Sequence, residues 1–139
     1  MNYDLLLGSL ADDPEGLRGL LPSEFTFLGI PVQVFIQTEP IPRLAPRQPN
    51  LAELSLAREI LENLTSILQR SEAALRIHFQ ERPEFIAAAS DPCIWINEEA
   101  IELDGPKRWT FVVGNSQNES YGTHVEFDGL EVCRVWSGD

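Results

Sequence analysis

Residues 123–136, THVEFDGLEVCRVW, contain two runs of alternating apolar and polar side chains on either side of an Asp-Gly pair. Such alternation is typical of strands that bury one face. An Asp-Gly pair favours a two-residue hairpin turn. With Asp128 and Gly129 as the turn, Phe127 faces Leu130, and the stretch predicts a β-hairpin with one face against a core.

This register separates two sets of side chains on opposite faces of the hairpin. The core face would carry Val125, Phe127, Leu130, Val132 and Trp136. On the other face His124 would lie opposite Cys133, and Glu126 opposite Glu131. Two glutamates that face each other repel, so we expect water or a cation beside them.

Three interpretations of this second face are open. As a metal site, His124, Cys133 and a glutamate are zinc-compatible ligands, although the chain has no CxxC, HxH or HExxH motif. As an acid/base site, Glu126, Glu131 or Asp128 would tune the imidazole of His124. As the solvated side of a sheet, the four residues have no shared role. We favour this last interpretation and expect no bound metal.

The first part of the chain predicts one hairpin between two irregular segments. Residues 8–22 contain three glycines and two prolines, which indicates an irregular segment. Phe25–Leu28 and Val32–Thr38 show strand-like patterns around Gly29, so we expect them to pair. Residues 40–49 contain four prolines and predict a connector.

A helical pattern follows the connector. Asn50 and Glu53 fit a capping box, and apolar spacing continues to about residue 80. The pattern predicts one amphipathic helix, or two if residues 63–66 break it, with Leu61, Leu64 and Leu68 buried against a sheet. A shorter helix is expected from Pro83 to about residue 90.

The rest of the chain has strand character again, in residues 93–96, 101–103 and 109–113, with loop composition at 114–118. The order strands, helices, strands predicts a single α+β domain over residues 1–139. We expect an antiparallel β-sheet, formed by the first hairpin and a C-terminal meander, that packs against one long amphipathic helix and a shorter one.

The composition restricts the partners. The chain has 139 residues, 43% hydrophobic and 23% charged, with a formal net charge of -12. Such a charge repels nucleic acid and anionic membranes and attracts a basic protein. The apolar run at residues 5–7 is too short for a secretory signal, so we expect a cytoplasmic protein in which Cys93 and Cys133 are free thiols.

Further candidate binding residues lie outside the hairpin. Glu98 and Glu99 would bind a basic partner or form a solvated rim. Trp95, Trp109 and Trp136 would line a ligand groove or belong to the core. The chain has no GxSxG, no phosphate-binding glycine loop and no nucleotide fingerprint, so we expect no cofactor and favour a non-enzymatic role, with catalysis left open as the alternative.

The pattern FTFLGIPVQVFI, the helix LAELSLAREILENL and the final meander with WTFVVG and YGTHVEFDG resemble small bacterial α+β domains, some of which resemble immunity proteins that neutralise toxins. The resemblance spans most of residues 25–136, and we transfer no functional residue from it. Small size, strong acidity and the absence of a catalytic signature favour a non-enzymatic interaction domain. Our leading hypothesis is an acidic, immunity-type domain that binds a basic protein. The alternative is a small-ligand or metal-binding domain, with or without enzyme activity, centred on the C-terminal hairpin.

Overall fold

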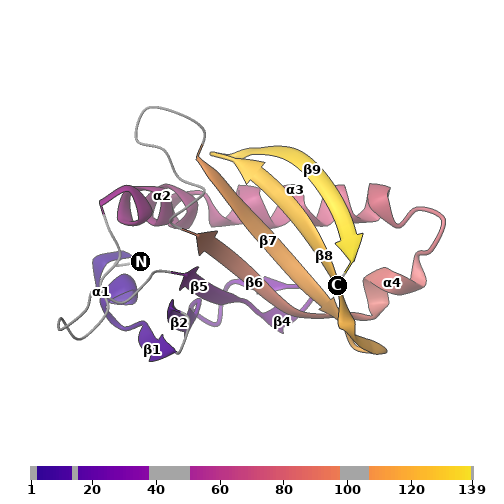
Figure 1. The fold of residues 1–139 in the computed structure, drawn as a ribbon, viewed down its shortest axis with the longest axis horizontal. Helices are drawn as coiled ribbons and strands as arrows, with labels where there is room; N and C mark the ends of the chain where they lie inside the picture. The colour runs from indigo at the N-terminus through magenta and orange to yellow at the C-terminus, as the bar shows by residue number, and fades with distance from the viewer. Residues whose placement is uncertain (1–2, 14–15, 38–50, 98–106, 139) are drawn as a thin grey trace.

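A seven-stranded sheet with two helices along one face organises the structure, a computed structural model that describes residues 3–13, 16–37, 51–97 and 107–138 (Figure 1). In spatial order its strands are β1 (Ala11–Asp13), β2 (Gly16–Leu20), β5 (Gln33–Gln37), β6 (Ala89–Asn97), β7 (Arg108–Asn115), β8 (Asn118–Asp128) and β9 (Glu131–Gly138). Neighbouring strands are antiparallel except β5 and β6, which are parallel. The mixed α+β class is therefore confirmed, and the expected antiparallel sheet is confirmed except at the parallel β5–β6 pair.

The helices lie mainly between the two parallel strands in the sequence, where a crossover is needed. They are α1 (Tyr3–Gly8), α2 (Leu51–Glu62), α3 (Leu64–His78) and α4 (Glu84–Ala87). Asn63 separates α2 from α3, and its side-chain amide donates a hydrogen bond of 2.8 Å to the Glu59 carbonyl. Of the two alternatives for the long helix, the structure has the broken one, and α2 and α3 run end to end behind the sheet (Figure 1).

The core fills the space between these helices and the sheet. From the sheet it receives Val34, Ile36, Ile94, Ile96, Phe111, Val125 and Phe127, and from the helices Leu56, Ile60, Ile67 and Leu75. The predicted burial of Leu61 and Leu64 is confirmed, whereas Leu68 is only partly buried. Burial of large apolar side chains on both layers is the main stabilising term of such a fold.

The expectation of an irregular segment over residues 8–22 is wrong, because this region contains β1 and β2. Its glycines allow close strand packing rather than a loop. A Cβ at Gly16 would lie 2.2 Å from the carbonyl oxygen of Ile36, so only glycine lets the β1–β2 hairpin approach β5.

The first predicted hairpin is also wrong in extent. Only β3 (Thr26–Phe27) and β4 (Ile30–Pro31) pair with each other, and β5 joins the large sheet between β2 and β6. There Val34 and Ile36 are buried beside Ile94 and Ile96, which a small exposed hairpin would not allow.

Two other sequence expectations concern loops and connectors. Of the predicted loop at 114–118, only residues 116–117 form a turn, because β7 extends to Asn115 and β8 begins at Asn118. Asn50, the proline-rich connector at 40–49 and the predicted strand at 101–103 lie outside the described residues.

Candidate functional site

The C-terminal hairpin exists, but its register differs from the predicted one. Asp128 faces Glu131, so the turn residues are Gly129 and Leu130. An irregularity then shifts the pairing, and Glu126 faces Arg134. The predicted opposition of Glu126 and Glu131 is therefore wrong, and the electrostatic reason for a cation between them is absent.

Contacts to the rest of the fold set this turn. The Asp128 carboxylate accepts a hydrogen bond of 2.9 Å from the Lys107 backbone N–H, and the Gly129 N–H donates one of 2.9 Å to the Lys107 carbonyl. The indole N–H of Trp109 donates to the Gly129 carbonyl at 2.6 Å, and Arg70 of α3 donates to the Leu130 carbonyl. Gly129 adopts a φ of 59°, where glycine has no steric cost.

The shifted register brings His124 against Trp136. Their rings stack with centroids 4.0 Å apart and planes 7° from parallel. The Trp136 indole N–H donates to the Glu126 carboxylate at 3.1 Å, and the Arg134 Nε lies 3.7 Å from its other oxygen. The assignment of Trp136 to the core face is therefore wrong, because it lies on the same face as His124.

Glu131 and Cys133 do not join this group. Glu131 is exposed and lies 3.5 Å from the Arg70 guanidinium, and Cys133 is exposed at the shifted position of β9. Since His124 faces Trp136 and not Cys133, the suggested metal ligands are not brought together. Across the described ranges, no group of three or more His, Cys, Asp and Glu side chains is placed to hold a metal ion.

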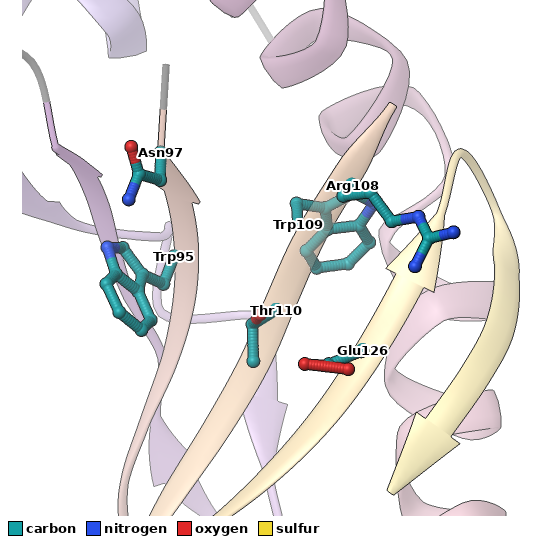
Figure 2. Close-up of a pocket in the computed structure, with 6 residues that line it drawn as sticks. All are labelled: Trp95, Asn97, Arg108, Trp109, Thr110 and Glu126. Carbon is teal, nitrogen blue, oxygen red and sulfur yellow. The ribbon is translucent and has the colours of Figure 1, made fainter. Parts of the chain in front are cut away.

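A pocket of about 300 Å³ opens on the same face of the sheet. It is lined by Trp95, Asn97, Arg108, Trp109, Thr110 and Glu126. Figure 2 shows Trp95 and Asn97 on β6, Thr110 on the neighbouring β7 and Glu126 on β8. The register explains this set, because Trp95 pairs with Thr110 and Thr110 pairs with Glu126 across three adjacent strands.

Neighbouring groups hold the pocket walls. The Gln37 side-chain carbonyl accepts hydrogen bonds from the Trp95 indole at 3.1 Å and from the Asn97 amide at 3.4 Å. Trp109 borders the pocket, but its indole stacks on Phe127 at 4.3 Å and only 2% of the residue is exposed. Trp109 therefore supports the pocket from the core side, and Trp95 is the tryptophan that a ligand would meet.

We call the sheet surface turned away from α2 and α3 the open face. In register across the strands it carries Arg18, Phe35, Trp95, Thr110, Glu126, His124, Arg134 and Trp136. Arg18 lies over the Phe35 ring at 4.4 Å, and Arg134 over the Trp136 ring at 5.6 Å. No described helix or strand lies in front of β6 to β9 on this face (Figure 1).

Burial changes the titration of two groups on this face. Desolvation lowers the pKa of His124 from its ordinary value of 6.5, and the nearby Glu126 carboxylate opposes this effect to a smaller extent. Desolvation raises the pKa of the Cys93 thiol to about 11, against a smaller opposing effect of Arg18. His124 is thus a neutral imidazole near neutral pH, and Cys93 is an unreactive thiol.

The sequence indicated part of this site. His124, Glu126 and the three tryptophans were candidates, and the structure brings His124, Glu126, Trp95 and Trp136 onto one face. Thr110, Asn97 and Arg134 were missed, although the alternation of Trp95 and Asn97 with buried Ile94 and Ile96 contained the signal. Glu98 and Glu99 lie outside the described residues.

Comparison of the chain with protein-family models, with curated proteins and with solved structures finds no match. Among the described residues, no helix is long and apolar enough to cross a membrane.

Proposed function

We propose that the protein is an acidic interaction domain that binds a basic protein partner through the open face. The observation that carries this proposal is the pocket that Trp95 and Glu126 both line, on a sheet surface that no described helix or strand covers. Neutralisation of a basic toxin is the concrete version of this function that we propose, with the protein acting in the cytoplasm.

The composition of the open face supports a protein partner. Tryptophan and arginine are the residue types most enriched at the energetic centres of protein interfaces. Trp95 and Trp136 are both partly exposed, and Arg18 and Arg134 each lie over an aromatic ring. These rings and guanidinium groups are held in place by their neighbours, so little side-chain entropy is lost when a partner docks.

The pocket is suited to one cationic side chain of that partner. The indole of Trp95 offers a cation–π surface, and Glu126 offers a carboxylate that is about one-third exposed. A carboxylate has about four acceptor positions, of which the Trp136 indole N–H occupies one, while the Arg134 Nε lies 3.7 Å from the other oxygen as an ion pair. A volume of about 300 Å³ is at the small end for drug-sized ligands but accommodates an arginine or lysine side chain.

The charge of the whole chain favours the same kind of partner. A net charge of -12 attracts a basic protein over long range and raises its association rate at low salt. The open face itself also carries Arg18, Arg108 and Arg134. We therefore expect a partner that is basic overall and presents acidic side chains opposite these arginines.

Affinity capture from native lysate tests this proposal through two matched variants. Wild type, Trp95→Ala and Ile77→Ala are compared, since Ile77 is 70% exposed on α3, away from the open face. We expect a basic protein that wild type and Ile77→Ala retain equally and Trp95→Ala loses by about tenfold or more. A captured protein that all three variants retain equally, or no basic protein at all, contradicts the proposal.

The second candidate function is binding of a small cationic ligand in the same pocket, favoured by the presence of Trp95 and Glu126 in its lining, with Thr110 between them. Titration with arginine methyl ester, followed by the Trp95 indole signal in NMR spectra, separates it from the first. A small-ligand site shows saturable binding of the free compound, whereas a protein interface binds a single side chain too weakly to saturate.

A further inference from the structure

A second pocket, of about 630 Å³, lies where β7 ends and β8 begins. Trp95 is far from it along the sheet, because it pairs with Thr110 near the start of β7. It is formed where α3 ends, where α4 follows, and by the turn between β7 and β8. Aromatic rings make one of its walls. Phe79 contacts Phe85 edge-on at 5.4 Å, and Phe85 contacts Tyr121 edge-on at 6.0 Å, which gives a continuous aromatic surface.

Two asparagines present hydrogen-bond donors to this pocket. The side-chain carbonyl of Asn115 accepts the Gln117 backbone N–H at 2.9 Å. That of Asn118 accepts the Ser120 N–H at 3.3 Å and lies 2.9 Å from its hydroxyl. Because a backbone N–H can only donate, these bonds fix the carboxamide orientation and leave both NH₂ groups available to a ligand.

Arg82 adds a positive charge to these donors. Its guanidinium lies 5.7 Å from the Phe85 ring centre, and it forms no ion pair in the described part of the chain. By contrast, Arg70, Arg76 and Arg134 each have a carboxylate within 4.0 Å.

Among the residues that the structure describes, no carboxylate lines this pocket, although the chain has 22 acidic residues. Glu81, Glu84 and Glu119 lie close in sequence, but they are exposed and do not line it. An acceptor-rich, negatively charged group is therefore the complement of the polar wall, and a planar ring is the complement of the aromatic wall.

We infer that this second pocket binds a small aromatic anion, in which a phosphate or carboxylate contacts Arg82 and the asparagine amides while the ring packs on Phe85 and Tyr121. The volume lies within the range of small-molecule sites. The inference is independent of the proposed function, since no residue is shared with the Trp95 pocket.

NMR titration with adenosine monophosphate, and with adenosine and inorganic phosphate as its two halves, tests this inference. Benzoate is titrated in parallel to distinguish a carboxylate from a phosphate. We expect adenosine monophosphate or benzoate to shift the signals of Phe85, Asn118 and Tyr121 in a saturable manner. Each half of the nucleotide should bind more weakly than the whole, because ring and anion contact different walls.

Two arginine variants decide whether the anion is bound as inferred. Arg82→Gln, at an exposed position, should weaken binding of the better probe by about tenfold or more, because a charged hydrogen bond is lost. Arg76→Gln, in the last turn of α3 and outside the pocket, should bind the probe as wild type does. Equal binding by Arg82→Gln and wild type, or no shift with either anion, overturns the inference.

Discussion

The imidazole of His124 stacks face to face on the indole of Trp136, with ring centroids 4.0 Å apart. Because the same indole donates its N–H to Glu126, the stack connects the histidine to the carboxylate of the Trp95 pocket. The pKa of His124 is therefore sensitive to the arrangement of these residues on the open face.

We expect the pKa of His124 to lie below 6.5 in the folded protein, because burial disfavours the imidazolium. The unfolded chain then binds the proton more readily than the folded one. Stability is therefore unaffected by this group above 6.5 and falls as the pH decreases from 6.5 toward the folded pKa. Urea unfolding at several pH values should show a flatter profile in this window for His124→Gln.

Glu126→Gln should lower the pKa of His124 further, because the carboxylate partly offsets the effect of burial. NMR titration of the imidazole signals in wild type and variant measures the difference. A raised or unchanged pKa in Glu126→Gln would show that the carboxylate does not act on the imidazole across the Trp136 stack.

The two thiols should react very differently with Ellman's reagent. Cys133 is exposed, whereas Cys93 is buried and burial raises its pKa to about 11. We expect rapid reaction of one thiol in the native protein, loss of that reaction in Cys133→Ser, and reaction of Cys93 only after denaturant is added. A fast native reaction in Cys133→Ser would mean that Cys93 is accessible from the open face.

Leu64→Ala should reduce the free energy of unfolding by about 2 to 5 kcal/mol, because Leu64 is 2% exposed at the start of α3 and its removal leaves a cavity. Ile77→Ala is the matched control on the same helix, with an expected cost below about 0.5 kcal/mol. Chemical denaturation measures both losses in the free energy of unfolding. Equal losses would mean that the buried face of α3 is assigned wrongly.

Arg70 joins α3 to the turn between β8 and β9 through the Leu130 carbonyl and Glu131. We expect Arg70→Met to cost about 1 kcal/mol, because the carbonyl loses its donor. Glu131→Gln should cost less than about 0.5 kcal/mol, because that ion pair is largely exposed. A larger loss in Glu131→Gln than in Arg70→Met would contradict this division.

The fold class was predictable because its signals are local. The helical spacing after Asn50 and the alternation around Val125 each identify an element without knowledge of its neighbours. The pairing of these elements was not predictable in the same way. The alternation of Val34 and Ile36 fits a strand of a small hairpin as well as it fits a central strand. Only the pairing of β5 with β2 and β6, which buries these side chains, decides between the two arrangements.

The candidate site depended on the pairing register of β8 and β9. A shift of this register by one residue changes every facing pair. The Asp-Gly pair located the hairpin correctly, but Asp128 stays in the strand because its carboxylate binds the Lys107 N–H. Arg70 and Trp109 then bind the carbonyls of Leu130 and Gly129. These three contacts come from other elements, so no local pattern in residues 123–136 contains them.

Photo-crosslinking from the Trp95 pocket tests the central claim most directly. A photoreactive phenylalanine analogue at position 110 lies between Trp95 and Glu126, and the same analogue at position 73 lies on the exposed side of α3. In native lysate we predict an adduct with one basic protein from position 110 and none from position 73. Equal adducts from both positions, or an adduct from position 73 alone, would contradict a binding role for the open face.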